Sequence, residues 1–346
     1  MKKIAIVGHF GYGYTYYDGQ TVKTKNLACE LDTCFGENEV VKLDTHGGLK
    51  SICKIILNLL KIQRKCQNVL ILPAYNGLKV IAPVLALCKS FSGCALHYAV
   101  VGGWLPVYLD KKQFLKKALL KFDGIYVETS TMKRELEKRG FHNVTVMVNF
   151  KDLKILEKEE LTDPSKELFR LCTFSRVMME KGIGDAAMLI RQINDQCKKV
   201  VYQLDIYGPV DPQQQEWFQN LTASFPDYVR YCGAVPPEKS VQTLRNYDCL
   251  LFPTKYYTEG VPGTIIDAYA SGLPVISSRW MNFEDVVDHG VTGWGYEFDD
   301  LDALKELLLQ LPNRTAELAQ MRLNCLKKAE SFLPRSAIAP LLNNLK

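Results

Sequence analysis

The stretch Tyr257–Ser277, YTEGVPGTIIDAYASGLPVIS, predicts a loop, a short helix and a strand in that order. Pro262 suits the first position of the helix, because proline has a preset φ and needs no amide acceptor there. Gly272 suits the end of the helix, and an apolar strand begins at Val275. We therefore expect a helix whose N-terminus faces the loop that carries Glu259.

The start of this predicted helix has the chemistry of an anion site. The amides of Gly263, Thr264 and Ile265 have no expected acceptor within the helix, and the macrodipole places about half a positive charge behind them. Glu259 precedes the first turn and Asp267 lies inside the helix, so a bound phosphate ester can offer hydroxyl groups to both carboxylates. This combination suits a sugar nucleotide. The plainer alternative is that the two acidic residues only stabilise a surface helix, and for Asp267 alone the two interpretations weigh about equally.

This stretch resembles the signature of the family 4 retaining glycosyltransferases, which have the GT-B fold. The resemblance rests on EGVP from Glu259, on an acidic residue eight positions later, and on the run AYASGLPV that follows. The family usually has Glu where this chain has Asp267, whose shorter side chain leaves its reach to the ribose open. The resemblance implies that Glu259 contacts the donor sugar and that Asp267 holds the ribose. It also places further residues at the donor: Gly260, Val261, Pro262, Gly263 and Thr264.

Arg176 and Lys181 form a second motif, in the loop after a predicted strand at 169–174. Arginine offers a fork of donors and lysine a movable charge, and both can neutralise a departing diphosphate. In the family, an Arg and a Lys at this spacing bind the donor diphosphate, which itself helps to take the acceptor proton. We therefore expect no metal, and no cofactor besides a UDP- or GDP-linked sugar as donor. The chain also has no recognisable Ser-His-Asp or Cys-His arrangement.

The first half of the chain is less diagnostic. Residues 3–7 predict a buried strand, followed by a loop rich in glycine and tyrosine and a helix at 20–31. In the family two glycines of this loop face the donor and the acceptor; Gly19 matches the second, and Asp18 replaces the first. The loop lacks the GxGxxG spacing, which disfavours a nicotinamide dinucleotide. The resemblance further implies that backbone groups near Val235 surround the nucleotide base.

Alternating strands and helices predict an α/β protein of two Rossmann-like, doubly wound parallel-sheet domains facing a cleft. The segment 151–166 is charged, has no strand periodicity and contains a turn signal, so we place the linker there. The predicted domains are an acceptor-side domain at 1–160 and a donor domain at 161–333. The resemblance implies that 334–346 form a helix that crosses back to the first domain.

The composition excludes several classes of protein. The 346 residues, 47% of them hydrophobic, can fill two cores. A net charge of +5 is too small for a typical nucleic-acid binder, but it fits an anionic substrate or a membrane surface. Eleven cysteines without a CxxC pair indicate neither disulfides nor zinc. Because no signal-peptide core and no spanning segment are recognisable, we expect a cytoplasmic protein.

Two basic helices are predicted in the first half, at 50–66 and 111–121. The first places isoleucines and leucines on one face and lysines elsewhere, and such helices can rest on anionic lipid. Contact with the inner face of the cell membrane would suit a polyprenyl-diphosphate-linked acceptor. The plainer alternative, a helix packed on the sheet with a solvated basic side, is somewhat favoured.

We interpret the chain as a retaining glycosyltransferase of the hexosyltransferase type. It would move a sugar from a nucleotide-sugar donor to a saccharide or lipid-linked acceptor in bacterial surface polysaccharide assembly. One alternative is an inactive nucleotide-sugar-binding partner subunit, which the departures at Asp18 and Asp267 keep open. Another is a GT-B nucleotide-sugar epimerase, which would need further carboxylates near the sugar. Hydride transfer comes third.

Overall fold

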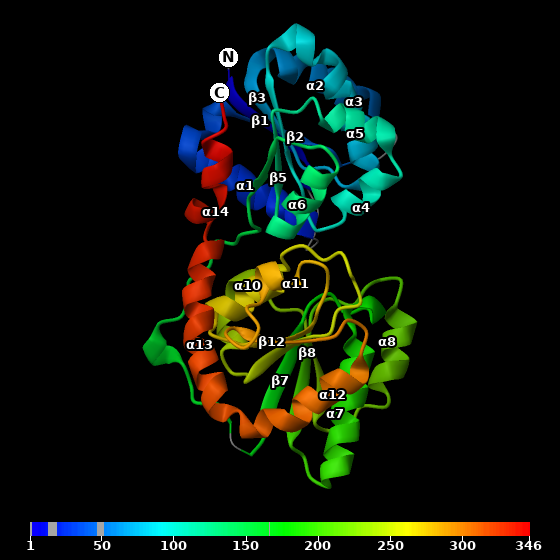
Figure 1. Ribbon diagram of the computed structural model, residues 1–346, viewed down its shortest axis with the longest axis vertical. Helices are drawn as coiled ribbons and strands as arrows, with labels where there is room; N and C mark the ends of the chain where they lie inside the picture. Colours follow the sequence, from blue (N-terminus) through cyan, green and yellow to red (C-terminus); the bar gives the residue numbers. More distant parts are fainter. Residues whose placement is uncertain (1, 13–18, 47–51, 166) are drawn as a thin grey trace. The chain divides into compact units, whose positions relative to one another are not determined.

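The computed structural model describes residues 2–12, 19–46, 52–165 and 167–346 (Figure 1). The chain forms two compact units, Met1–Asp152 with Pro334–Lys346, and Leu153–Leu333. Each unit contains a six-stranded parallel sheet flanked by helices. The predicted fold class of two Rossmann-like domains is therefore confirmed. Asp18 lies outside the described residues, so its predicted place in the first loop is not described.

The first unit is built on a parallel sheet with the order β2-β1-β3-β4-β5-β6. Its strands are β1 (Lys2–Gly8), β2 (Val40–Asp44), β3 (Cys66–Ile71), β4 (Ala95–Ala99), β5 (Gly124–Val127) and β6 (Val144–Val146). Its helices before the linker are α1 (Gly19–Phe35), α2 (Ile52–Lys65), α3 (Tyr75–Ser92), α4 (Leu105–Asp110), α5 (Gln113–Leu119) and α6 (Ser130–Lys138). The central strands are continuous apolar runs because helices cover both faces of the sheet.

The end of the chain belongs to the core of the first unit. In α14 (Pro334–Leu342), Ala337, Ile338 and Leu341 are buried in one cluster with side chains of β1 and α1. The amide of Lys346 donates to Asn68 Oδ1 at 3.0 Å, which fixes the last residue beside β3. The segment that was expected to cross back thus packs beside the first strand of the chain.

The second unit has a parallel sheet with the order β12-β11-β10-β7-β8-β9. Its strands are β7 (Phe169–Phe174), β8 (Tyr202–Tyr207), β9 (Val229–Gly233), β10 (Cys249–Phe252), β11 (Val275–Ser278) and β12 (Gly293–Tyr296). Its helices are α7 (Ile183–Cys197), α8 (Gln215–Thr222), α9 (Ser240–Leu244), α10 (Gly263–Ala270), α11 (Phe283–Val286), α12 (Leu301–Gln310) and α13 (Thr315–Ala329). We did not predict β12, because its sequence GWGY is too short and too rich in glycine to show strand periodicity.

The segment predicted as the linker packs on the second unit. The Leu156 amide donates to Ala270 O at 2.9 Å, and the Ser165 amide donates to Asp248 Oδ1 at 2.8 Å. These bonds hold the charged segment against α10 and β10, so the structural division falls after Asp152 rather than at 160. Among the described residues, no helix combines the length and apolar character that crossing a membrane requires.

The packing of α14 predicts that Leu341→Ala destabilises the first unit. Leu341 is fully buried, so its truncation should lower the free energy of unfolding by about 2–5 kcal/mol through lost burial and a residual cavity. Urea unfolding and hydrogen exchange of the β1 amides would measure the change. Ser336→Ala, at an exposed position of the same helix, should have little effect. Equal unfolding curves for the two variants would contradict the packing of α14.

Candidate functional site

The loops that follow β7 and β10 bring two predicted site residues together. Lys181 ends the short helix η4 (Met179–Lys181), and its ammonium donates to Glu259 Oε1 in the loop after β10. Thr254 Oγ1 donates to the same carboxylate oxygen at 3.1 Å. The Lys181 and Glu259 side chains are only 17% and 16% exposed. Both therefore lie at the carboxyl ends of neighbouring strands, where ligands of open α/β sheets bind.

Aromatic rings and an amide surround this ion pair. The Lys181 ammonium lies 5.3 Å from the ring centre of Phe252 and 5.0 Å from that of Tyr256, within the range of cation–π interaction. Burial raises the pKa of the Tyr256 phenol, so this ring stays neutral near pH 7. Asn282 Nδ2 donates to the carbonyl oxygen of Glu259 and fixes the loop from the other side. The lysine is thus held in place beside a carboxylate that can accept hydrogen bonds from hydroxyl groups.

Two glycines allow the loops to approach so closely. Gly182 has a φ of +69°, and a Cβ at this position would lie 2.0 Å from Pro253 O. Gly208 has a φ of +132°, and its Cβ would lie 1.8 Å from Ser175 O. No other residue fits either position without moving a backbone. Neither these glycines nor Thr254 and Asn282 were predicted as site residues. The available sequence signals were that Gly182 ends the loop after β7 and that Gly208 directly follows β8.

Arg176 lies in the same loop as Lys181 but has a different partner. Its Nη1 is 3.6 Å from Asp211 Oδ2, and 45% of its side chain is exposed. The Val177 amide donates to Pro209 O at 2.9 Å, and the Asp211 amide donates to Val177 O at 3.0 Å. These bonds tie the Arg176 loop to the loop after β8. The structure therefore pairs Lys181 with Glu259. The Arg176 guanidinium, five residues earlier in the chain, lies partly exposed beside Asp211 instead.

The N-terminus of α10 differs from the prediction in two details. Pro262 is the N-cap, with φ −66° and ψ 128°, so the helix begins at Gly263 rather than at the proline. The expectation that the Ile265 amide lacks an acceptor was wrong, because it donates to Pro262 O at 3.0 Å in a tight first turn. Among the described residues, no acceptor bonds the amides of Gly263 or Thr264. These two amides keep the capacity to bind an anion.

The other predicted residues of this stretch differ in exposure. Gly260 and Val261 are buried, so they shape the turn before the helix and offer mainly backbone groups. Thr264 is partly exposed, and its hydroxyl is buried without a hydrogen-bond partner among the described residues. A buried hydroxyl without a partner is unusual in a folded protein. It therefore adds a polar group that can serve a ligand at the helix start.

Asp267 is only 2% exposed. This burial rules out the plainer interpretation, in which Asp267 only stabilises the N-terminal end of a surface helix. Its Oδ1 lies 3.2 Å from Ser240 Oγ, at the start of α9. The same serine oxygen lies 2.8 Å from Pro237 O in η5 (Pro237–Lys239). The single hydroxyl hydrogen of Ser240 is shared between these two acceptors, and the serine thereby links the Asp267 carboxylate to the loop after β9. No local pattern indicated Ser240, because it lies 27 positions from Asp267 along the chain.

The predicted roles of Val235 and Gly19 in donor binding stay predictions. Val235 lies half-buried in the loop between β9 and η5, and no hydrogen bond to its backbone is found among the described residues. Gly19 is the exposed first residue of α1, in the first unit. A Cβ at Gly19 would meet no atom within 4 Å, so the fold of this unit does not require glycine there.

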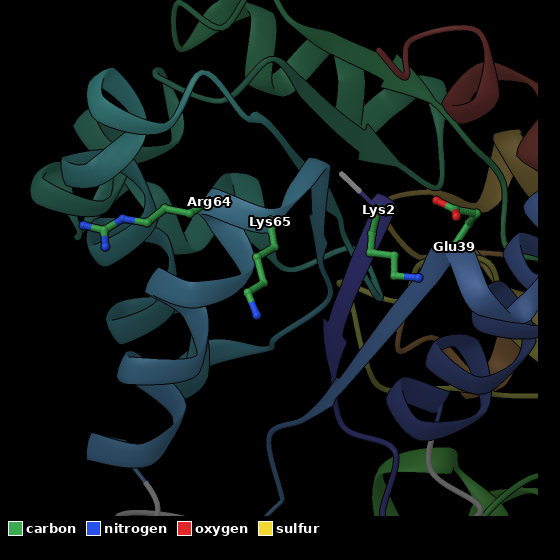
Figure 2. A pocket seen from close by; sticks show the side chains of 4 residues that line it. All are labelled: Lys2, Glu39, Arg64 and Lys65. Atoms are coloured by element: carbon green, nitrogen blue, oxygen red, sulfur yellow. The ribbon is translucent and has the colours of Figure 1, made fainter.

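The first unit has a hollow of about 420 Å³ at the amino end of its sheet, lined by Lys2, Glu39, Arg64 and Lys65 (Figure 2). It lies at the opposite end of this sheet from the strand ends where ligands usually bind. Within the described ranges, no group of three or more His, Cys, Asp and Glu side chains is arranged to hold a metal ion.

Comparison with known families agrees with the chemistry of the second unit. Residues 169–313 match the family of glycosyl transferases group 1. The matched range contains Arg176, Lys181, Glu259 and Asp267. The resemblance to glycosyltransferases is thereby confirmed, while membership of family 4 stays a prediction.

Curated glycosyltransferases share the same region. The amylovoran biosynthesis glycosyltransferase AmsK of Erwinia amylovora is 27% identical over 176 residues, which are 50% of this chain and 43% of that protein. The putative colanic acid biosynthesis glycosyltransferase WcaL of Salmonella typhimurium is 24% identical over 144 residues, 40% of this chain and 35% of that protein. The matches thus span less than half the length of these curated relatives.

Solved structures support the fold over the whole chain. The HepE protein of Anabaena, solved with UDP and glucose, has a TM-score of 0.73 at 16% identity, and the match covers 100% of both chains. Sucrose-phosphate synthase of Thermosynechococcus elongatus has a TM-score of 0.76 at 14% identity, with coverage of 99% and 98%. At this identity the likeness shows the GT-B fold alone.

The geometry at Gly182 predicts that Gly182→Ala destabilises the second unit. A Cβ would collide with Pro253 O and would force a side chain into a left-handed conformation, at a cost of about 1–3 kcal/mol. Gly184→Ala, two residues later in α7, is the matched control, because its Cβ would meet nothing closer than 3.6 Å. This control should be neutral or slightly stabilising. Urea unfolding compares the two, and equal stability would contradict the close approach.

Proposed function

We propose that the chain is a retaining glycosyltransferase that uses a nucleotide-diphosphate sugar as donor. The observation that carries the proposal is the pairing of Lys181 with Glu259 at the carboxyl edge of the second sheet, within the part that matches glycosyl transferases group 1. A positioned cation beside a carboxylate provides one group for a diphosphate and one for sugar hydroxyls. The same stretch carries the start of α10.

Each predicted residue has a role in this proposal. Lys181 and Arg176 neutralise the diphosphate as it departs, and the Gly263 and Thr264 amides add the field of the helix terminus. Glu259 accepts hydrogen bonds from the donor sugar. Asp267, positioned by Ser240, accepts hydrogen bonds from the ribose. The base lies against the backbone near Val235.

The resemblance to retaining glycosyltransferases supports the chemical step in this proposal. The acceptor oxygen bonds to the anomeric carbon on the face from which the diphosphate leaves, and the glycosidic bond to the diphosphate breaks. The proton of the acceptor hydroxyl passes to a diphosphate oxygen, so the protein needs no dedicated base. Because Lys181 and Arg176 supply the positive charge, the proposal requires no metal. Donor binding must loosen the ion pair between Lys181 and Glu259, since each group then contacts the donor.

We also propose the nucleotide base of the donor and the chemical class of the acceptor. HepE, which shares the fold, was solved with UDP, so we favour a UDP-linked donor over a GDP-linked one. The names of AmsK and WcaL refer to amylovoran and colanic acid biosynthesis. We therefore propose a saccharide acceptor in surface polysaccharide assembly, carried on polyprenyl diphosphate.

The two alternatives make different demands on the site. An inactive partner subunit does not need Arg176, Lys181 and Glu259 together, yet all three are present. An epimerase needs further carboxylates near the sugar, whereas the side chains bonded to the Glu259 carboxylate are those of Lys181 and Thr254.

The central prediction concerns Glu259 and Lys181. Glu259→Ala should remove turnover of the preferred donor and keep nucleotide binding, because Glu259 serves the sugar. Lys181→Ala should lower kcat/KM by about 10²–10³, the usual cost of losing one preorganised group that stabilises the leaving charge. Thermal shift and nucleotide release with UDP-, GDP- and ADP-sugars would measure both effects, and EDTA should leave turnover unchanged.

A matched control lies in the same loop. Lys255→Ala removes a lysine that pairs with Asp185 at 2.7 Å and makes no contact with Glu259 among the described residues, so its turnover should stay near that of the natural protein. If no nucleotide sugar binds, the proposal fails. Binding without turnover for every acceptor would favour the inactive partner, and loss of activity with EDTA would overturn the metal-free step.

A separate prediction tests the ribose contact. Asp267→Asn and Ser240→Ala should each weaken the binding of the nucleoside diphosphate by about tenfold, because a charge-assisted hydrogen bond is lost or misdirected. Calorimetry with the ribonucleotide and its 2′,3′-dideoxy analogue separates this role from a structural one. Both variants should lose discrimination between the two ligands. Retained discrimination would show that Asp267 does not contact the ribose.

A further inference from the structure

Residues 45–122 have an unusual charge distribution. They include twelve lysines and arginines and a single acidic residue, Asp110. Asp110 is already engaged, because both of its oxygens accept from Arg139 at 2.8 Å. This pairing lowers the pKa of the Asp110 carboxyl and uses its charge on a cation outside the segment. The positive charge of the segment is therefore hardly compensated from within.

Much of this charge is carried by three neighbouring helices. α3 packs against both α2 and α5 in the first unit. Leu59, Leu85 and Leu115 face the sheet and are fully buried. No acidic residue occurs on any of the three helices. The three helices therefore contribute no negative side chain to this side of the unit, where Lys89 of α3 pairs with Asp123, just after α5, at 2.8 Å.

Large apolar side chains stand on this outer surface. They include Leu57 on α2, Leu87 and Phe91 on α3 and Phe114 on α5, which are 60%, 69%, 91% and 53% exposed. An isolated exposed leucine is normal, but several exposed apolar side chains on adjacent helices mark an interaction surface.

Cations lie among these apolar side chains at helical spacing. On α2, Lys54, Leu57, Lys61 and Arg64 recur every three or four residues and share one stripe. Within the described part of the chain, neither Lys54, Lys61 nor Arg64 has an ion-pair partner. On α5, Phe114 and Lys117 repeat the pattern.

We propose that the outer surface of α2, α3 and α5 docks on an anionic lipid bilayer. Phe91 and Leu87 enter the interfacial region, and Lys54, Lys61, Arg64 and Lys117 contact lipid phosphates. Basic helices with exposed apolar side chains bind such interfaces because apolar burial and attraction to anionic lipid act together. A nucleic acid satisfies the cations but leaves the Leu and Phe side chains exposed.

Two hollows meet at Arg64 on this side of the unit. One, of about 100 Å³, lies between α2 and α3 and is lined by Leu60, Gln63, Arg64, Cys88, Phe91 and Ser92. The other is the hollow that Arg64 lines with Lys2, Glu39 and Lys65. Figure 2 shows Lys65 extending between α2 and β1, while Arg64 points away from the sheet. Arg64 therefore stands with Phe91 at the smaller hollow and points away from Lys2 and Lys65, so a lipid phosphate bound by its guanidinium would lie near an exposed apolar ring.

The inference goes beyond the proposed sugar transfer and is tested without donor or acceptor. The full chain is sedimented with vesicles of phosphatidylcholine alone and of phosphatidylcholine mixed with phosphatidylglycerol. We expect binding to the mixed vesicles, weaker binding as salt rises, and little binding to the neutral ones. Lys61→Gln with Arg64→Gln, and separately Leu87→Ser with Phe91→Ser, should each lower the partition coefficient about tenfold.

Matched variants in the second unit serve as controls. Arg191→Gln with Lys327→Gln makes the same change in net charge, and Met188→Ser removes an apolar side chain that is 43% exposed. Both should bind vesicles like the natural protein. No binding to anionic vesicles, equal loss in the control variants, or preference for a nucleic-acid duplex over vesicles would overturn the proposal. None of these outcomes affects nucleotide-sugar binding, so failure here is distinct from failure of the transferase assignment.

Discussion

The close approach of two backbones at Gly182 is the constraint on which the candidate site depends. Only glycine lets the chain pass so near Pro253 O with a positive φ, and this passage places Lys181 next to Glu259. Gly208 does the same for the loop after β8, which holds Asp211 near Arg176. The charged side chains thus owe their positions to backbone packing at the carboxyl ends of parallel strands.

Burial of charge in this region needs compensation from neighbours. A desolvated carboxylate or ammonium is costly unless it is paired and hydrogen-bonded, and Lys181, Glu259 and Asp267 each have such partners. The first unit has a comparable pair, in which the Lys23 ammonium donates to Glu128 at 2.6 Å and to Val100 O at 2.9 Å. Buried pairs of this kind add little net stability, so their concentration at strand ends is better explained by function.

The chain has a net charge of only +5, but its acidic and basic residues are unevenly distributed along the sequence. Opposite charges are interspersed in the second unit, whereas residues 45–122 of the first unit contain Asp110 as their only acid. Because helices α2, α3 and α5 lie next to one another, this bias becomes one basic surface that also exposes apolar side chains. The candidate donor site and the basic surface with exposed apolar side chains therefore belong to different units of the chain.

The sequence by itself determined the α/β class, most strands and helices, and the motif residues from Glu259 to Asp267, because these follow from local periodicity and from glycine and proline preferences. Only the tertiary structure decided that Lys181 meets Glu259, that Arg176 meets Asp211 and that Ser240 holds Asp267. It also decided that Ile265 bonds Pro262, and that residues 153–165 pack on the second unit. Such contacts join residues far apart in the chain, or depend on the exact turn geometry. They are fixed by strand order and by close loop packing, which no local pattern encodes.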